Sequence, residues 1–391
     1  MSLNLCKTTW KRVRLGDVIR RSRTQVTPGS VDIDRYVGGG HIDSDSLAIE
    51  RFGDVNDGQM GSTFTYLFQP GQILFVSARP YLRKSGIVNF SGVVADKTYV
   101  LDAAPENGLL QEFLPFLLAS DHFIAYATAE ATGSMNPRLL WGQMQRYEFA
   151  LPPLDEQKRF ADLMWSVEAH QNSRGVLAAS LGLAYESWLE KKLSGQTTRH
   201  LGEIVRLQHG RPVPSNLYGD VGVALLRPGD MKPNGRTQWT DSSVRIPASF
   251  TEENADCSLS PGDLVINMTA QSLEDRFLGR VCRMHDAAFL NQRIGRLTPV
   301  QGITPEFLHI ALRTPAFSAW VARRSEGSKV KHMHWRHIED YPLPFPSEDV
   351  QAEIVAEVAS WTRAMDSVAH EARTVSTLKQ TVTSEIFGGV K

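Results

Sequence analysis

Two stretches of the chain have the apolar spacing of long helices. In residues 347–391, apolar side chains recur at alternating steps of four and three, and only Lys379 interrupts them: Ile354, Val358, Trp361, Met365, Val368, Ala372, Val375, Val382 and Ile386. In residues 155–195 a similar seam, with polar breaks at His170 and Arg174, is formed by Leu163, Val167, Leu177, Leu181, Ala184 and Trp188. This heptad spacing predicts two helices that pack through their seams.

The segments before the two helices have a different pattern. Short β-type runs follow turn residues, as in 72–76 after Pro70-Gly71 and 263–266 after Pro261-Gly262. Helical stretches are expected around 112–130 and 306–324. Proline-rich segments at 151–153 and 342–346 then predict breaks, because proline lacks an N–H donor and disfavours helix at the preceding residue. Each half therefore reads as a mixed α/β lobe followed by a long helix.

The two halves repeat one another at an offset of 194 residues. The matches join Glu112-Phe113-Leu114 to Glu306-Phe307-Leu308, Phe123 to Phe317, Gly133-Ser134 to Gly327-Ser328, Trp141 to Trp335, Tyr147 to Tyr341, Pro152 to Pro346 and Gln157 to Gln351. Matches in this number and in one register indicate a tandem duplication, and a repeat decides the architecture.

The pattern predicts an α+β protein with pseudo-twofold internal symmetry. Two duplicated α/β domains (1–154 and 196–346) are expected to be separated by two long antiparallel coiled-coil helices (155–195 and 347–391). At 1.5 Å per residue each helix would be about 60 Å long, between one and two turns of B-DNA. This length suggests a ruler for two half-sites. The alternative is that the helices serve to dimerise with another chain.

Composition narrows the class of protein. The chain has 391 residues and suits two or three domains. It contains no apolar run of eighteen residues and no apolar N-terminal stretch, so we expect neither a membrane span nor a secretory signal. The separated Cys6, Cys257 and Cys282 form no disulfide framework, which fits a reducing cytoplasm.

Net charge gives weak support for binding nucleic acid. The whole chain carries −1, whereas the two predicted lobes together hold 33 basic and 30 acidic side chains. The excess has the sign that DNA binding requires, but it is too small to establish this function by itself.

Several motifs together resemble the specificity subunits of type I restriction–modification enzymes. They are the opening Trp10-Lys11-Arg12-Val13-Arg14-Leu15-Gly16-Asp17-Val18, then Pro70-Gly71-Gln72-Ile73-Leu74, the segment Ala129 to Pro137, and the hinge Leu151-Pro152-Pro153-Leu154-Asp155-Glu156-Gln157. The hinge is the most specific of them. The second copy departs from it, since Pro346 and Gln351 remain but Val350 replaces the glutamate. The resemblance covers essentially the whole chain.

This resemblance implies a non-catalytic DNA reader. Each lobe would be a target-recognition domain for one half of a bipartite site on double-stranded DNA. Two methyltransferase subunits would bind S-adenosylmethionine and methylate adenine in each half-site, and restriction subunits using ATP and Mg²⁺ would complete the nuclease. The chain itself would bind no cofactor.

The motifs of catalysis are absent from the sequence. There is no P-loop and no Asn/Asp-Pro-Pro-aromatic quartet, and the Gly38-Gly39-Gly40 run lacks the strand–turn–helix setting of a nucleotide loop. His332, His334 and His337 cluster, but no cysteine or carboxylate pair stands beside them at a zinc-site spacing. We therefore predict no catalytic residue and no metal site, and assign the histidines to a basic loop facing DNA.

Two loops in each lobe concentrate the side chains that read base edges and hold phosphates, namely 79–84 and 133–138 in the first lobe and 267–276 and 327–334 in the second. Further candidates lie at equivalent strand edges, at 96–97 and 291–293. The DNA-binding candidates of the first lobe are Arg79, Tyr81, Arg83, Lys84, Lys97, Ser134, Asn136 and Arg138. Those of the second lobe are Gln271, Ser272, Arg276, Asn291, Gln292, Arg293, Ser328, Lys329, Lys331 and His334. For each residue the alternative is an ordinary solvated side chain.

The first long helix also carries apolar residues away from its seam. A helix with more than one apolar side requires more than one neighbour. We predict that Phe160, Met164, Trp165, Tyr185 and Leu189, together with Val176 and Leu183, dock methyltransferase helices. The alternative is contact with the chain's own lobes.

Three other functions compete with this interpretation. One is a stand-alone recognition module of an atypical phage-defence system, which genome neighbourhood would distinguish. The second is a nuclease with a dispersed metal site, and the third is a coiled-coil scaffold with carbohydrate-binding lobes. Metal-dependent cleavage by the isolated chain and a DNA pull-down, respectively, would separate these from a DNA reader.

Overall fold

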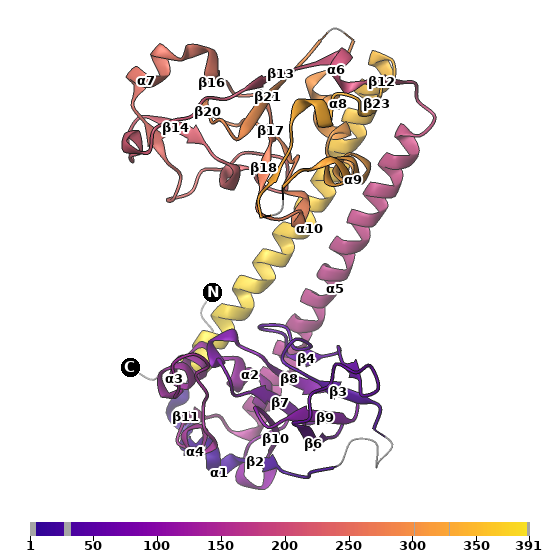
Figure 1. The fold of residues 1–391 in the computed structure, drawn as a ribbon. Helices are drawn as coiled ribbons and strands as arrows, with labels where there is room; N and C mark the ends of the chain where they lie inside the picture. The colour runs from indigo at the N-terminus through magenta and orange to yellow at the C-terminus, as the bar shows by residue number, and fades with distance from the viewer. Residues whose placement is uncertain (1–4, 27–32, 301, 328, 389–391) are drawn as a thin grey trace. The chain divides into compact units, whose positions relative to one another are not determined.

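The structure, a computed structural model, describes residues 5–26, 33–300, 302–327 and 329–388. Its contacts divide the chain into two compact units (Figure 1): unit 1 is Met1–Leu177 with Val368–Lys391, and unit 2 is Ala178–Ser367. Each unit combines one lobe with part of both long helices. No helix among the described residues is both long and apolar enough to span a membrane.

Lobe 1, from Lys7 to Leu151, is built on two sheets. Among the described residues the larger has the order β2-β10-β7-β8-β4, and the smaller has the order β5-β3-β9-β6. Its strands are β1 (Lys11–Arg14), β2 (Ile19–Ser22), β3 (Arg35–Val37), β4 (Ala48–Ile49), β5 (Gly53–Asp54), β6 (Phe64–Phe68), β7 (Ile73–Val76), β8 (Ser85–Val88), β9 (Gly92–Ala95), β10 (Thr98–Ala103) and β11 (Glu148–Leu151). Its helices are α1 (Leu15–Val18), α2 (Leu114–Ala119), α3 (Asp121–Glu130) and α4 (Trp141–Gln145).

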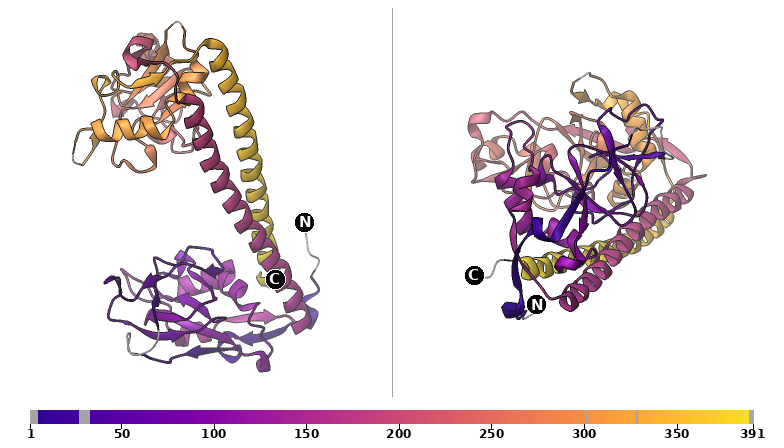
Figure 2. Two further views of the ribbon diagram at one scale, coloured as in Figure 1. Left: turned by 90° about the vertical axis from the view of Figure 1, so that its right-hand side faces the viewer. Right: turned by 90° about the horizontal axis from the view of Figure 1, so that it is seen from below.

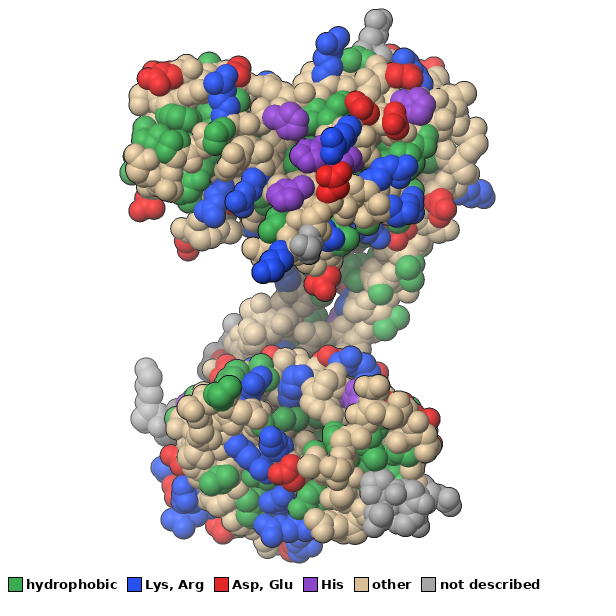
Figure 3. Space-filling view, viewed as in Figure 1, with side chains coloured by type: hydrophobic (Ala, Val, Ile, Leu, Met, Phe, Trp, Pro, Cys, Tyr) green, Lys and Arg blue, Asp and Glu red, His purple; other side chains and the backbone are tan. Residues whose placement is uncertain are grey.

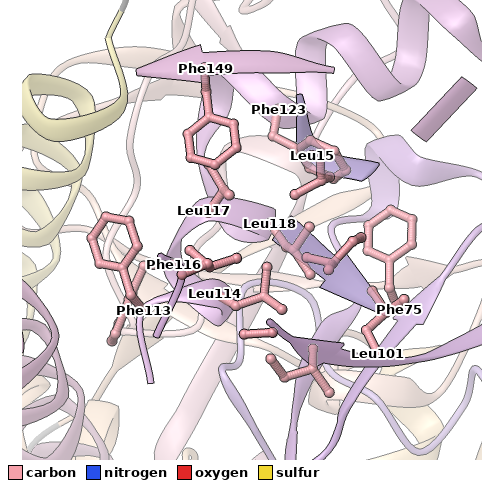
Figure 4. Close-up of a cluster of buried hydrophobic side chains, with 14 of the residues drawn as sticks. Leu15, Phe75, Leu101, Phe113, Leu114, Phe116, Leu117, Leu118, Phe123 and Phe149 are labelled. Atoms are coloured by element: carbon pink, nitrogen blue, oxygen red, sulfur yellow. The ribbon is translucent and has the colours of Figure 1, made fainter. Parts of the chain in front are cut away.

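Helices α2 and α3 complete the core of lobe 1. They bury Phe116, Leu117 and Phe123 against Phe75 of β7 and Leu101 of β10 (Figure 4). Ser120 separates the two helices, and its hydroxyl accepts a hydrogen bond from the Phe123 N–H, as an N-cap residue does. The predicted helical stretch at 112–130 is therefore two helices with a cap between them.

Lobe 2, from Thr198 to Pro344, also has two main sheets among its described residues, with orders β13-β21-β17-β19 and β15-β14-β20-β16. Its strands are β12 (Thr198–His200), β13 (Val205–His209), β14 (Val223–Leu226), β15 (Arg245–Ile246), β16 (Ser258–Leu259), β17 (Leu264–Asn267), β18 (Thr269–Ala270), β19 (Val281–Arg283), β20 (Ala288–Leu290), β21 (Ile294–Pro299), β22 (Lys331–His332) and β23 (Pro342–Pro344). Its helices are α6 (Leu201–Ile204), α7 (Ala248–Glu253), α8 (Pro305–Ala311) and α9 (Pro315–Arg324).

The same hydrogen bonds recur in the two lobes at an offset of 194. The Gln157 amide donates to the carbonyls of Gly108 and Pro152, and the Gln351 amide donates to those of Gly302 and Pro346. Their Oε1 atoms accept the N–H groups of residues 110 and 304. Isolated bridges join 132 to 138 and 326 to 332. Both glutamines are fully buried, so each ties a long helix to the lobe that precedes it.

The long helices are α5 (Leu154–Leu193) and α10 (Glu348–Phe387), which Figure 2 shows without a break. Within unit 1, Glu168 pairs with Lys379 at 2.5 Å and Arg174 with Glu371 at 3.0 Å. Within unit 2, Lys192 contacts Glu353 and Glu357 at 2.8 Å, and the rings of Trp188 and Trp361 lie 6.0 Å apart. In each unit the residue numbers rise on one helix as they fall on the other, so the helices run antiparallel there.

The seam predicted for α10 agrees with burial, and the seam predicted for α5 is partly wrong. All nine α10 seam residues are buried or half-buried. On α5, however, Leu163 and Leu177 are 44% and 38% exposed. The face of α5 turned to α10 in unit 1 carries Glu168 and Arg174, which make ion pairs. An apolar pattern cannot locate a seam that is held by charges.

One proline-rich break is also a correction. Pro342-Leu343-Pro344 forms strand β23, which pairs with β12. Proline is tolerated in this strand because β23 has a neighbour on one side only, and the missing N–H groups cost no ladder bonds there.

Candidate DNA-binding surfaces

A cleft of about 920 Å³ opens on lobe 2 and gathers polar side chains from segments that are far apart in sequence. One wall carries Gln271, which follows β18, and His332 of β22. The floor carries Asn291, Gln292 and Arg293 from the turn between β20 and β21. Strands β18 and β22 pair with each other, and this pairing brings residues 270 and 331 together across about sixty positions of sequence.

The floor turn is held rigidly. The Asn291 side chain is 8% exposed, and its Oδ1 accepts the backbone N–H of Arg293. The Gln292 N–H donates to the Arg211 carbonyl, and Gly210 packs so closely on Asn291 that a Cβ would lie 2.2 Å from the Asn291 carbonyl oxygen. Gln292 and Arg293 themselves are exposed, so a fixed backbone presents two free side chains to the cleft.

The opposite wall was missed by the sequence analysis. It contains Tyr218, Arg227 and Lys232, with Thr240 and Ser242. The buried Asp230 carboxylate shapes this loop by accepting the N–H of Arg227 and the hydroxyl of Ser243. Arg227-Pro228-Gly229-Asp230 has the composition of a turn, but no apolar period links it to the residues across the cleft.

The other candidates of lobe 2 lie away from this cleft or at its edge. Arg276 has a left-handed backbone (φ 50°) and pairs with Glu186 of α5 at 2.9 Å, so its guanidinium is engaged within the chain. Ser272 is exposed, and its hydroxyl accepts the N–H of Glu274. Lys329 is exposed, Lys331 is half-buried in β22, and His334 packs on His337. Ser328 lies outside the described residues.

In lobe 1 the two predicted loops meet. The N–H of Arg79 donates to the Pro137 carbonyl at 2.7 Å, and residue 78 bridges residue 138. The Lys97 carbonyl accepts the N–H and the hydroxyl of Ser77, two residues before Arg79. The side chains of Arg79, Lys97, Ser134 and Asn136 are exposed around this junction. Tyr81, 50% exposed, follows on the turn Pro80–Leu82.

Three charged candidates of lobe 1 bind groups within the lobe itself. Arg83 binds Asp45, Asp121 and the Ala119 carbonyl. Burial lowers the pKa of Arg83, but the two carboxylates together raise it above its ordinary value. Arg138 donates to the Ser77 hydroxyl and to both the carboxylate and the carbonyl of Asp96. Lys84 donates to the Gly39 carbonyl. These contacts shape the loops, whereas Arg79 and Lys97 remain exposed.

Strand β2 and the residue that follows it add two arginines, Arg21 and Arg23, that the sequence analysis overlooked. Arg21 lies 4.2 Å from the ring of Tyr99, and Arg23 and Arg138 are close enough to act on it electrostatically. Burial lowers the pKa of Arg21, and its Nε is buried without a hydrogen-bond partner. The run Arg20-Arg21-Ser22-Arg23, with three basic residues in four, could have indicated this basic surface from the sequence.

Figure 3 shows Lys and Arg side chains gathered on the displayed face of lobe 1, and His beside Lys and Arg on lobe 2.

The histidine cluster makes local contacts. The His337 Nδ1 accepts the His334 N–H at 3.2 Å, and Nε2 lies 3.1 Å from Glu326. Within the ranges that the structure describes, no three His, Cys, Asp or Glu side chains converge as a metal site would require.

The predicted docking residues divide by exposure. Met164 and Leu189 are 1% and 3% exposed and belong to the cores of their own lobes. The Trp165 indole donates to the Glu112 carbonyl and meets Phe116, and Phe160 packs on the same core. Tyr185 is half-buried against Trp361. Val176 and Leu183, by contrast, are 68% and 71% exposed.

The chain was compared with known protein families, sequences and structures. Residues 7–174 match the family described as the type I restriction modification DNA specificity domain. No curated protein sequence matched the chain.

Three solved structures resemble the chain over nearly its full length. A chain from work on complex assembly and conformational transition of the type I R-M system has 20% identity and a TM-score of 0.62, covering 97% of this chain and 98% of its own. The type I S subunit from M. genitalium has 14% identity and a TM-score of 0.54, with both chains fully covered. The HsdS subunit from Thermoanaerobacter tengcongensis has 19% identity and a TM-score of 0.42, with 98% and 97% covered.

The first two likenesses show a shared fold, and the family match identifies the N-terminal part directly. Residues 7–174 match the family of type I restriction modification DNA specificity domains, and the chain shares its fold with a chain from a type I R-M system and with a type I S subunit.

Proposed function

We propose that the protein reads a bipartite DNA target, with one lobe on each half-site and with α5 and α10 as an antiparallel coiled-coil spacer. The recurrence of the Gln157 and Gln351 bonds, of the bridges at 132–138 and 326–332, and of the N-caps at Ser120 and Thr314 supports a duplicated domain. Two equivalent lobes suit two half-sites. The division into domains 1–154 and 196–346 with helices 155–195 and 347–391 stays a prediction.

The cleft of lobe 2 is the observation that carries this proposal. It presents Gln271, Gln292 and Arg293. In the major groove, glutamine side chains typically pair with adenine and arginine side chains with guanine. Arg227 and Lys232 on the other wall suit the phosphate backbone, and Asp230, the acidic residue that lines the cleft, is buried and hydrogen-bonded. In lobe 1 the junction of Arg79, Lys97, Ser134 and Asn136, extended by Arg21 and Arg23, fills the same role.

We further propose that the chain does its work inside a larger complex. Two methyltransferase subunits holding S-adenosylmethionine would methylate adenine in the half-sites, and restriction subunits would use ATP and Mg²⁺ to cut the DNA. The exposed Val176 and Leu183 support docking on α5 better than the buried Met164 and Leu189 do. A cytoplasmic location follows from this role.

The test is the methylated sequence. The chain is co-expressed with the methyltransferase subunit encoded beside it, and methylated adenines are mapped by single-molecule sequencing. We expect a two-part motif with a fixed gap. Arg293→Ala should relax the sequence of one half only, while Arg206→Ala, an exposed arginine outside the cleft, should change nothing.

A contiguous motif, or relaxation of both halves by Arg293→Ala, would contradict the assignment of one lobe to each half-site. The alternative functions have separate outcomes. DNA binding by the isolated chain without any methyltransferase would favour a stand-alone module of an atypical phage-defence system. Cleavage by the isolated chain with Mg²⁺ would favour a nuclease.

A further inference from the structure

A second groove, of about 1130 Å³, lies within unit 2 between the last turns of α5 and helices α8 and α9. Its apolar lining includes Leu183, Tyr185 and Leu189 of α5 and Trp320 of α9. Leu183, at the rim of the groove, is 71% exposed. An exposed apolar groove with polar edges is typical of a surface that binds another protein.

The groove carries an excess of positive charge. Its lining includes Arg276, Arg280, Arg313 and Arg323 against Glu186 and Glu190, and Arg276 is already paired with Glu186.

Arg313 has no such pair. Burial lowers its pKa, its Nη2 donates to the Pro233 carbonyl, and no carboxylate in the described part of the chain forms an ion pair with it. A half-buried cation without a counter-ion has lost part of its hydration, so a carboxylate entering the groove would be favoured.

The equivalent surface of unit 1 has lost these features. At the offset of 194, Ala119 stands for Arg313, Ala129 for Arg323 and Thr377 for Leu183. Lys379 stands for Tyr185, and its amine is held by Glu168. The pocket there measures about 390 Å³. Among the residues described, the groove of unit 2 therefore combines exposed apolar surface with a half-buried arginine that has no ion-pair partner, and the pocket of unit 1 does not.

We propose that this groove docks an acidic amphipathic segment of a methyltransferase subunit and that the equivalent surface of unit 1 does not. The apolar side of the segment would cover Leu183 and Trp320, and its carboxylates would face Arg313 and Arg323. This rests on the proposed assembly with two methyltransferase subunits. It adds that the two bind with unequal affinities, the tighter one at unit 2.

The experiment is a titration of the full chain with the methyltransferase subunit encoded beside it, followed by native mass spectrometry. Arg323→Glu and Leu183→Glu each alter an exposed rim residue. Ala129→Glu and Thr377→Glu are the matched controls at the offset of 194. We expect two dissociation constants for the unaltered chain. The first two variants should weaken the tighter site at least about tenfold, or about 1.4 kcal/mol, and the controls should leave it unchanged.

Three results would overturn the proposal. The first is unchanged affinity of the tighter site in both groove variants, and the second is an equal loss of that affinity in the controls. The third is a dimer of this chain alone that Arg323→Glu dissociates. If the folded, unaltered chain binds no methyltransferase subunit, the proposed assembly fails as well. In that case a gel shift with the isolated chain would show whether the lobes still bind DNA, so failure of the assembly is distinguishable from failure of DNA reading. Thermal unfolding of each variant confirms that the chain is folded.

Discussion

At the scale of single residues, two buried glutamines connect the lobes to the helices. Each donates to two backbone carbonyls and accepts a backbone N–H. The sequence showed that Gln157 and Gln351 occupy matching positions, and the structure gives the reason, since a straight-chain amide can donate to two carbonyls and accept an N–H at once.

Gln157→Ala and Gln351→Ala should each destabilise the protein by about 1–3 kcal/mol, because buried backbone groups would lose their partners. Urea unfolding would measure this, with Gln380→Ala, an exposed helical position, as the control. An effect of either variant no larger than that of the control would refute the assigned role.

Arg79 and Arg83 stand close in sequence but differ in environment. In the complex with the methyltransferase subunits, Arg79→Ala should weaken DNA binding and lower its salt dependence by about one phosphate contact, with thermal stability unchanged. Arg83→Ala should instead lower the free energy of unfolding by about 1–2 kcal/mol, since Asp45 and Asp121 lose their partner. Fluorescence anisotropy in a salt series and thermal unfolding separate the two. A DNA-binding loss from Arg83→Ala at unchanged stability would reverse the assignment.

His309 should make lobe 2 sensitive to acid. Burial, with Arg313 beside it, lowers the pKa of His309 to about 4, below its ordinary 6.5, while Nε2 bonds the Gly235 carbonyl. The unfolded chain therefore binds more protons between these values, and stability falls as pH falls from 6.5 toward 4. Between pH 7 and pH 5 the unaltered protein should lose about 2 kcal/mol more than His309→Gln, whose amide can keep the bond. Equal losses in urea unfolding would contradict this.

At the scale of elements, α5 contains two glycines that no close contact requires. A Cβ at Gly175 or Gly182 would meet nothing within 4 Å, and neither has a positive φ. Glycine in a helix interior costs about 1 kcal/mol relative to alanine. Each Gly→Ala variant should therefore raise stability by up to this amount, as measured by the urea midpoint. Destabilisation would show that α5 bends or is contacted there.

The two long helices were the most predictable elements, and the errors in their predicted seams show what an apolar period can and cannot predict. The apolar period of α10 placed all nine seam residues correctly, because water-excluded contacts follow hydrophobicity. On α5 the contacts in unit 1 are made by Glu168 and Arg174, so the apolar residues Leu163 and Leu177 pointed to the wrong face. Strand β23 was hidden by its prolines for a similar reason, since its place beside a single neighbour is a tertiary fact.

The candidate site was only partly predictable. Loops rich in Arg, Asn and Gln were found by composition, and several of these residues do line the cleft of lobe 2. Whether a given arginine is exposed, like Arg79, or held by carboxylates, like Arg83, depends on residues distant in sequence. The wall formed by Arg227 and Lys232 becomes part of the site because β14 pairs in parallel with β20, so that the residues following the two strands lie at the same edge of the sheet.

At the scale of the whole molecule, the two long helices of the proposed reader act as a spacer between its lobes. The measurement that tests this most directly is the methylated motif of a chain with seven residues inserted in each helix, after Gly175 and after Ala372, which keeps the heptad register. Seven helical residues add about 10 Å, or about 3 base pairs. We expect a methylated motif with unchanged half-sites and a gap longer by about 3 base pairs. An unchanged gap in a folded, active complex would contradict it.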